Sequence, residues 1–326
     1  MSGMSLYNAS YRHHIISNGL SLAFEPWRNT TLNDVMQLTP LEHIQATLNS
    51  LQRNLADQTP EYKEDVRLAK QLYDALKTNR FTFNREPWFC TRDVVRWLAE
   101  GTPIARLPQE LLLRAKTADG EEIPPGPAVA AFVGLGLAKD LDLFLVPKML
   151  EYGREKGCFP VSVNVSSSAV VSPDFWQQSF TFLREHLKNG GKKTDVVFEV
   201  ERSALDSEEG LKAIKRVRES GFRFAVDDFY SEDLRPEQID TIVQHIDFIK
   251  FTGEAIQRGI EGKYNLNILV EQARAIGPEK LFVAKWVDNH EQAVRLLKEF
   301  KIDAAQGRNL PQNLKIFAAD VKKLLT

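Results

Sequence analysis

The stretch "DSEEGLKAIKRVRESGFRFAVDD", residues 206–228, decides the fold class because it joins a helix signal directly to a strand signal. In its first half, Asp206 and Glu209 are expected to form a capping box, apolar residues recur at helical spacing, and Gly221 ends the helix. The second half is a strand-sized apolar run that closes on two adjacent aspartates, Asp227 and Asp228. The stretch therefore predicts one unit of a repeating α/β fold.

The same alternation continues along the chain from Phe81 onward. Eight apolar runs are expected to be strands: "FTFNR", "QELLLRAK", "FPVSVNVS", "DVVFEVE", "FRFAVDD", "IDFIKF", "KLFVAK" and "IDAAQG". Helical segments separate most of them, and "CTRDVVRWLAEG" is expected to be a helix inserted between the first two. Eight strands favour a closed barrel of the TIM type over an open doubly wound sheet. No glycine-rich phosphate fingerprint follows the first strand, which disfavours a dinucleotide-binding fold.

The first part of the chain, residues 1–75, is expected to be a helical segment, and residues 76–326 to form the barrel. One helix begins at "TPLEHIQATLNSLQRNLADQ", where Thr39 and Glu42 form a capping box, and a second begins at "TPEYKEDVRLAKQLYDALK". Their apolar faces are suited to pairing with each other, to capping the barrel or to mediating dimerisation. The sequence leaves these three roles open.

Composition narrows the classes of partner. The 326 residues carry a formal net charge of -2, so no global field attracts a nucleic acid polymer or an anionic membrane. The chain has no signal-peptide pattern at its start and no span-length apolar run, which predicts a cytoplasmic protein. Cys90 and Cys158 are far apart and are expected to be buried thiols rather than a disulfide or a thiolate metal site.

Polar side chains lie toward the C-terminal ends of the predicted strands, where barrels of this type have their active sites. They are Glu110, Arg114, Asn164, Glu199, Asp227, Asp228, Lys250, Lys285 and Gln306. Any one of them alone is equally well a surface group or a helix cap. Asp288, with Glu291 three residues later, is expected to be a capping box and not part of the site.

The chemistry of this set admits two readings. Carboxylates and an asparagine are hard oxygen ligands, suited to two magnesium, manganese or calcium ions roughly 3.5 to 4 Å apart that hydrolyse a phosphoryl group. Lysines at barrel strand ends, Lys250 and Lys285, also serve carbonyl chemistry through a Schiff base. The acidic surroundings disfavour the second reading, because carboxylates raise a lysine pKa.

The chain resembles the EAL domain family of cyclic di-GMP phosphodiesterases from about Leu76 to Thr326. The resemblance is carried by "ELLLR" at Glu110, "NVS" at Asn164, "FEVERS" at Glu199, "AVDDF" at Asp227, "DFIKF" at Lys250, "VAKWVDNHEQA" at Lys285 and "DAAQGRNL" at Gln306. It implies a TIM-type barrel whose first strand is antiparallel, and a mouth that binds cyclic di-GMP with two magnesium or manganese ions.

The resemblance also implies roles for individual residues. Lys250 is similar to the lysine that holds the attacking water or phosphate, and Gln306 to the glutamine near the scissile group, so these two would be catalytic. Arg114 is similar to the arginine that grips a ligand phosphate, and Asp228, Lys250 and Gln306 would share in ligand binding. The metal ligands implied are Glu110, Asn164, Glu199, Asp227 and Asp228.

Four departures from the family pattern point to a degenerate member. Lys285 stands where the family has a glutamate that serves the metals. The family's glycine-rich loop is replaced by "DDFYSEDL" at 227–234, which is two residues shorter and has no glycine. Arg202 replaces the glutamate that anchors that loop. Glu86 replaces a glutamine that contacts the nucleotide, which puts a carboxylate toward an anionic ligand.

These departures predict a regulatory protein that does not hydrolyse cyclic di-GMP. It would sense the dinucleotide, bind another protein, or do both, and it would need no metal. A homodimer is compatible with this role. The alternative is an active phosphodiesterase that uses magnesium or manganese to give linear pGpG. In the degenerate reading the Lys285 ammonium pairs with Asp227, Asp228 or Glu110 and so takes the place of a metal ion.

Overall fold

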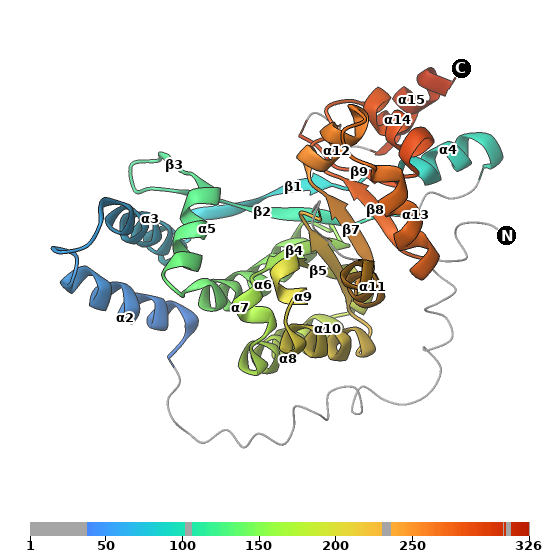
Figure 1. The fold of residues 1–326 in the computed structure, drawn as a ribbon. Coiled ribbons are helices and arrows are strands. Elements are labelled where there is room, and N and C mark those ends of the chain that lie inside the picture. The colour runs from blue at the N-terminus through green and yellow to red at the C-terminus, as the bar shows by residue number, and fades with distance from the viewer. Residues whose placement is uncertain (1–37, 102–105, 230–235, 309, 311–313, 326) are drawn as a thin grey trace.

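The computed structural model describes residues 38–101, 106–229, 236–308, 310 and 314–325. Its sheet runs in the order β1-β2-β4-β5-β6-β7-β8-β9, with the short β3 paired to β2 (Figure 1). β1 is antiparallel to β2, and every step from β2 through β4 to β9 is parallel. Phe89, just past β1, exchanges backbone hydrogen bonds of 2.8 and 2.9 Å with Ala305 of β9. The sheet thus closes on itself, which confirms the predicted barrel with an antiparallel first strand.

The strands lie where the sequence predicts them, and β3 is an addition. Their bounds are β1 Phe81–Pro87, β2 Gln109–Lys116, β3 Glu122–Ile123, β4 Val161–Val165, β5 Val196–Glu201, β6 Arg223–Asp227, β7 Phe248–Phe251, β8 Leu281–Ala284 and β9 Ala304–Ala305.

The helices alternate with these strands and cover the outer face of the sheet (Figure 1). Their bounds are α2 Pro40–Arg53, α3 Pro60–Lys77, α4 Thr91–Glu100, α5 Pro125–Gly134, α6 Ala138–Glu155, α7 Ser167–Val170, α8 Pro173–Lys188, α9 Arg202–Leu205, α10 Glu208–Glu219, α11 Pro236–His245, α12 Gly253–Ile260, α13 Leu266–Ile276, α14 His290–Phe300 and α15 Leu314–Leu325, with a 3-10 turn at Lys193–Asp195. The helix inserted between the first two strands is confirmed as α4.

Two of the three predicted capping boxes are wrong by one residue. Thr39 caps α2 as predicted, with Glu42 completing the box. For α10 the cap is Ser207 and not Asp206, because the Ser207 hydroxyl accepts from the Gly210 N–H at 3.1 Å. For α14 the cap is Asn289, whose side chain accepts from the Gln292 N–H at 2.9 Å, and not Asp288. Where two good capping residues are adjacent, backbone geometry decides which one is used.

β1 and β2 form an arm that extends beyond the barrel. β2 pairs with β4 only through Gln109 and Glu110, and the rest of its length pairs with β1 and β3. α3 packs against α5 and this arm, and α2 packs against α3 and α6 (Figure 1). Ile44, Leu48 and Leu72 of these helices are buried in the same core as the outer layer of the barrel. The division of the chain at residues 75 and 76 stays a prediction.

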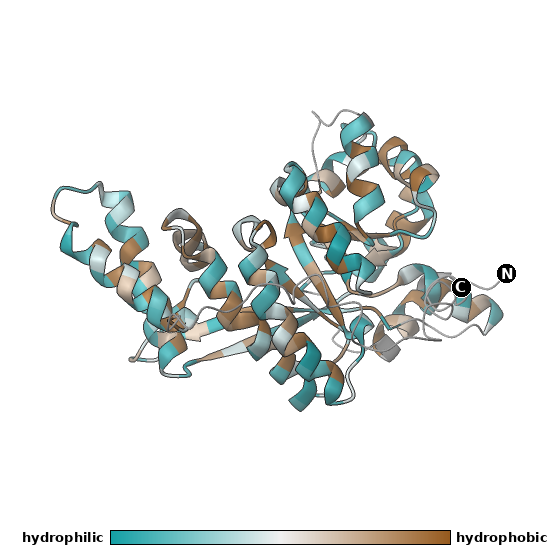
Figure 2. Ribbon diagram, turned by 90° about the horizontal axis from the view of Figure 1, so that it is seen from below, coloured by the Kyte–Doolittle hydropathy of each residue, from teal (hydrophilic) through white to brown (hydrophobic). Residues whose placement is uncertain are grey.

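Two apolar cores support the barrel. The larger core fills the space between the sheet and its helices, where the ribbon is brown on the inner sides of the helices (Figure 2). A smaller, separate core fills the barrel interior and consists of Trp88, Cys90, Leu107, Val197, Ala225, Phe248, Leu281, Val283 and Ala304. The interior of the barrel is therefore packed, and it gives the polar mouth above it a rigid base. Both cysteines are buried free thiols, as predicted.

Two aspartates fasten neighbouring strands at the opposite end of the barrel from the mouth. The Asp247 carboxylate accepts from the Phe224 N–H at 2.9 Å and pairs with Arg218 of α10 at 2.8 Å. The Asp303 carboxylate likewise accepts from the Phe282 N–H and pairs with Arg274 of α13. These two repeats thus each tie a strand, its preceding helix and the next strand through one buried or half-buried carboxylate.

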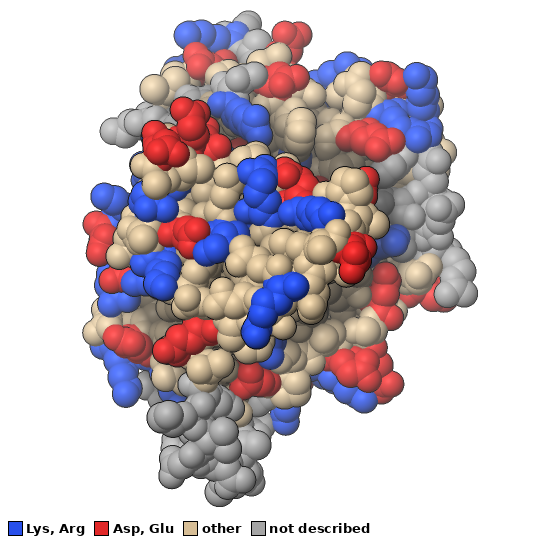
Figure 3. Space-filling view, turned by 90° about the vertical axis from the view of Figure 1, so that its left-hand side faces the viewer, with Lys and Arg blue, Asp and Glu red and all other residues tan. Residues whose placement is uncertain are grey.

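The surface carries charges of both signs. On the face that includes α2, α3 and α5, basic and acidic side chains are interspersed with uncharged surface (Figure 3). This distribution agrees with the near-neutral net charge. Within the described ranges, no helix combines the length and the apolar character that a bilayer crossing requires.

Candidate functional site

The polar mouth of the barrel follows from the alternation of side chains along each strand. Side chains two residues apart on a strand share a face. Five members of the interior core are therefore each followed, two positions later, by a polar side chain that points into the mouth. The pairs are Val197 with Glu199, Ala225 with Asp227, Phe248 with Lys250, Val283 with Lys285, and Ala304 with Gln306.

Lys250 is the centre of the mouth. Its side chain is completely buried, and its Nζ lies 3.0 Å from Glu110 Oε2 and 3.4 Å from Asp227 Oδ1. It also donates a hydrogen bond to Glu199 Oε2, and the Trp88 ring centroid lies 5.0 Å away. The family resemblance implies a lysine that holds water or phosphate at this position, and in the structure three carboxylates surround its ammonium.

Two amide side chains complete the deep part of the cluster. The Gln306 amide donates to Glu110 Oε2 at 2.6 Å, and the Asn164 amide donates to Glu110 Oε1 at 2.8 Å. Both oxygens of Glu110 are therefore engaged. Among the described residues, Glu199 Oε1 and Gln306 Oε1 are buried without a hydrogen-bond donor or acceptor.

Lys285 occupies the outer part of the mouth. Its Nζ lies 3.0 and 2.9 Å from the two oxygens of Asp227 and 2.7 Å from Asp228 Oδ1. Asp227 is thus the shared partner of both lysines. The predicted pairing of Lys285 with Asp227 and Asp228 agrees with this geometry, whereas the Glu110 partner proposed with them is taken by Lys250.

Burial and charge act in opposite directions on the pKa values in this cluster. Burial alone would lower the pKa of Lys250, but the adjacent Glu110, Glu199 and Asp227 raise it, so the ammonium stays charged. Burial would raise the pKa of Glu110, but Lys250 and the amides of Asn164 and Gln306 lower it to about 2. Burial and the charge of Glu110 raise the pKa of Glu199 to about 8. The Lys285 pKa is raised against its own burial, chiefly by Asp227.

The donor set does not fit a pair of metal ions. The residues implied as metal ligands do converge, because Glu110, Glu199 and Asp227 surround one point and Asp227 and Asp228 flank another. Both points are taken by ammonium nitrogens at hydrogen-bonding distance. Over the part of the chain that the structure describes, no cluster of three or more carboxylate, histidine or cysteine side chains is arranged to hold an ion.

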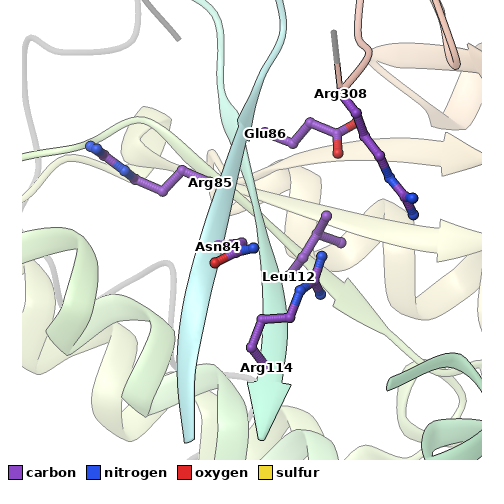
Figure 4. A pocket seen from close by; sticks show the side chains of 6 residues that line it. All are labelled: Asn84, Arg85, Glu86, Leu112, Arg114 and Arg308. Carbon is purple, nitrogen blue, oxygen red and sulfur yellow. The ribbon is translucent and has the colours of Figure 1, made fainter. Parts of the chain in front are cut away.

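Arg114 and Glu86, both implied as ligand-binding residues, differ in their distance from the lysines: Glu86 is the register partner of Glu110 and hydrogen-bonds to Gln306, whereas Arg114 lies four residues further along β2. They line a cavity of about 220 Å³ on the inner face of the β1–β2 arm, together with Asn84, Arg85, Leu112 and Arg308 (Figure 4). Burial and the neighbouring Glu110 raise the pKa of Glu86, and Gln306, Lys250 and Arg308 oppose that rise. Sequence reasoning missed Arg308, although its place two residues after Gln306 was a usable signal.

A second cavity of about 300 Å³ opens on the other side of the mouth. Apolar side chains of α5 and α6 form one wall, and carboxylates at the ends of β5 and β6 face them. Sequence reasoning missed three polar residues of this cavity: Asp142, Ser166 and Glu201. Arg202, predicted to replace a loop anchor, also lines it. Of the loop at 227–234, the part from residue 230 onward lies outside the described residues.

Comparison with known proteins agrees with this architecture. The model of the EAL domain family matches residues 105–312. The Cyclic di-GMP phosphodiesterase PdeF of Escherichia coli (strain K12) is 24% identical over 286 residues, which are 85% of this chain and 35% of PdeF. The chain therefore spans about a third of the length of this curated relative.

Two solved structures show the shared fold. The EAL enzyme Bd1971, in its cAMP and cyclic-di-GMP bound form, superposes with a TM-score of 0.62 at 16% identity, covering 88% of this chain and 77% of Bd1971. The FimX EAL domain from Pseudomonas aeruginosa bound to c-di-GMP gives a TM-score of 0.60 at 21% identity, covering 76% and 95% of the two chains. The family model, the closed barrel and its antiparallel first strand together place this chain in the EAL domain family.

Proposed function

We propose that this chain is a degenerate, non-hydrolysing EAL protein that regulates through binding rather than through turnover. The observation that carries the proposal is the Lys285 ammonium, which lies 2.7 to 3.0 Å from Asp227 and Asp228. A carboxylate at that position would add a negative charge to a cation site, whereas the ammonium adds a positive one. The change amounts to two charge units at the point where the family resemblance implies a metal ligand.

The magnitude of this change favours exclusion of a cation. Two unit charges at about 4 Å interact with roughly 4 kcal/mol at an effective dielectric near 20. A divalent ion next to Lys285 would meet at least that repulsion, and it would also have to displace an ammonium from its two carboxylate partners. Lys250 matches a lysine that the family pattern retains, so the exclusion of a cation is attributed to Lys285.

Cyclic di-GMP sensing is the second candidate, and the cavity of the β1–β2 arm supports it. Arg114 and Arg308 line that cavity and suit a phosphate, because guanidinium groups bind phosphate oxygens in a fork geometry. Glu86, in the same cavity, opposes an anion unless it is protonated or paired. Binding of a protein partner, formation of a homodimer and a cytoplasmic location belong to the same proposal.

The two enzymatic alternatives are less well supported. Phosphodiesterase activity that gives pGpG is favoured only by the retained carboxylates and Asn164 of the mouth. A Schiff-base reaction needs an uncharged amine, and the three carboxylates around Lys250 raise its pKa instead.

A hydrolysis assay tests the proposal. Purified full-length chain is incubated with cyclic di-GMP and either magnesium or manganese, and pGpG is quantified by chromatography. We expect no pGpG above the background without protein. Metal-dependent pGpG formation that a chelator abolishes would overturn the proposal.

Calorimetric titration with cyclic di-GMP then separates sensing from protein binding. If the dinucleotide binds through the arm cavity, Arg114→Ala and Arg308→Ala each weaken it, whereas Arg154→Ala, at an exposed position on α6, does not. Absence of heat at tens of micromolar ligand would remove the sensing version and leave the version that binds a protein.

A further inference from the structure

The cavity on the α5 side of the mouth combines an apolar wall with an acidic floor. Val129 and Val133 lie one helical turn apart on α5, and their side chains are 37% and 52% exposed. They line the same cavity as Glu199, Glu201 and Asp142. Exposed valines beside carboxylates suit a ligand that has both an aliphatic part and a positive charge.

The carboxylates of this cavity are held in place by local donors. Asp142 accepts through Oδ2 from the Ser166 N–H at 2.9 Å and from the Ser166 hydroxyl at 2.6 Å. Glu201 Oε2 lies 3.2 Å from the hydroxyls of both Ser167 and Ser203, which are 2.6 Å apart, so one hydroxyl donates to Glu201 and the other donates to its neighbour. In each case these hydrogen bonds engage one carboxylate oxygen of a side chain that lines the cavity.

Glu199 supplies a separate observation that points to a ligand. Its side chain is 1% exposed and lines the cavity, and its Oε2 binds Lys250. Within the described residues, its Oε1 is buried and has no hydrogen-bond partner. A buried carboxylate oxygen without a donor is costly, and a donor brought by a ligand would remove that cost.

The charged side chains of the cavity favour a ligand of positive charge. Five acidic side chains and one basic side chain, Arg202, line it. Among the described residues, Lys250 pairs with Glu199, and Lys285 pairs with Asp227 and Asp228, which leaves Glu201 and Asp142 as the acidic side chains of the cavity that no lysine pairs with. A phosphodiester would be repelled from this side of the mouth, whereas a guanidinium or ammonium group would be attracted.

We propose that this cavity receives an arginine side chain of a partner protein, with its aliphatic stem on Val129 and Val133 and its guanidinium group among Glu199, Glu201 and Asp142. Arginine fits better than lysine because its planar fork pairs with several carboxylate oxygens at once and is less strongly hydrated. The cavity volume of about 300 Å³ is at the lower limit of small-molecule sites, which suits one side chain better than a dinucleotide. The proposal rests on the proposed function and names the partner chemistry.

Matched dipeptides test the proposal on the full-length chain. N-acetyl-leucyl-arginine amide and its neutral counterpart N-acetyl-leucyl-citrulline amide are titrated by NMR. Because hydrogen bonds between charged groups contribute about 1.5 to 3 kcal/mol, the arginine peptide should bind at least about tenfold more tightly. Equal affinity of the two peptides, or no shift with either at about 10 mM, would overturn the proposal.

Variants localise the binding. Glu201→Gln and Val133→Ser should each weaken the arginine peptide several-fold, while Glu209→Gln on α10 and Val171→Ser, an exposed valine elsewhere, should leave it unchanged. An equal loss in Glu201→Gln and Glu209→Gln would show a general effect of surface charge and refute the site. Thermal unfolding of each variant checks that it is folded.

The two proposals fail separately. Absence of peptide binding would leave the non-hydrolysing proposal intact. Metal-dependent pGpG formation would overturn that proposal whatever the peptide does.

Discussion

Replacing Lys250 by methionine tests how strongly the mouth depends on its buried ammonium. Methionine has similar length and packs without a charge, so the main effect is electrostatic. The wild-type ammonium lies 3.0 Å from Glu110 and 3.4 Å from Asp227, donates to Glu199, and is completely buried. Removing one partner of a buried ion pair costs about 3 to 5 kcal/mol, because the other charge is left without compensation.

The stability lost in Lys250→Met should increase with pH. In the wild type, the pKa of Glu110 is lowered to about 2, so its stabilising contribution is present above the ordinary carboxylate pKa and is lost as pH falls toward 2. Without Lys250, burial raises the Glu110 pKa above its ordinary value. The Glu110 carboxylate then destabilises the variant as pH rises, whereas it stabilises the wild type. Protonation then relieves the variant at low pH, so the deficit should be small near pH 4.5 and full near pH 7.5.

Urea unfolding of the wild type and Lys250→Met at pH 4.5 and pH 7.5 measures this difference. Lys298→Met, at an exposed position on α14, is the matched control and should change the free energy of unfolding by less than about 0.5 kcal/mol. Glu199→Gln in the Lys250→Met background should recover part of the loss at pH 7.5. A variant as stable as the wild type at pH 7.5, or a deficit of equal size at both pH values, would refute the reasoning.

Three other predictions concern stability and are checked by unfolding. Burial raises the pKa of Asp142 to about 7, so its carboxylate destabilises the fold as pH rises from about 4 to 7. Asp142→Asn should flatten this pH dependence and raise the free energy of unfolding at pH 8 by about 1 to 2 kcal/mol, a value discounted for partial exposure. A lower free energy of unfolding at pH 8 would contradict this. Asp303→Ala leaves two arginines and a buried N–H without their acceptor and should cost about 3 to 5 kcal/mol; a cost below about 1 kcal/mol would argue against the fastening role. In Gly307→Ala the added Cβ would lie 2.0 Å from the Val287 carbonyl oxygen, so the variant should lose more than about 2 kcal/mol, and wild-type stability would show that the backbone yields there.

The barrel and the composition of its mouth were predictable because strand periodicity is a local property. Each of Glu199, Asp227, Lys250, Lys285 and Gln306 follows an apolar run of the sequence, and the two-residue period places them on one face. The resemblance placed Lys285 beside the carboxylates, and its charge then suggested Asp227, Asp228 or Glu110 as partners, of which the first two pair with it in the structure. Helix caps were predicted less well, because adjacent capping residues such as Asp206 and Ser207 are equivalent in sequence.

The position of Arg114 could not be read from the sequence. It lies four residues after Glu110 on β2, which corresponds to about 13 Å at 3.3 Å per residue. The strand leaves the barrel after Glu110, so the two residues line different parts of the surface. The surroundings of Lys250 could not be read from the sequence either, because nothing local to "DFIKF" reports the three carboxylates that converge on it from other strands.

The apolar and acidic cavity beside α5 depended on tertiary placement as well. Val129 and Val133 belong to a short apolar helix, and Glu201 ends a strand on the far side of the cavity. Only the fold of the chain brings them together. Sequence periodicity predicts which face of an element is apolar, but it does not predict which face stays exposed.

Counting bound manganese ions by electron paramagnetic resonance tests the central claim most directly, because the claim is that Lys285 takes the place of an ion at Asp227 and Asp228. The wild type and Lys285→Glu are titrated under identical conditions, with Lys298→Glu as a control for the same charge change at the surface. The account predicts that Lys285→Glu binds one more equivalent of manganese than the wild type and that the control does not. Manganese bound by the wild type with the same stoichiometry as by Lys285→Glu would contradict it.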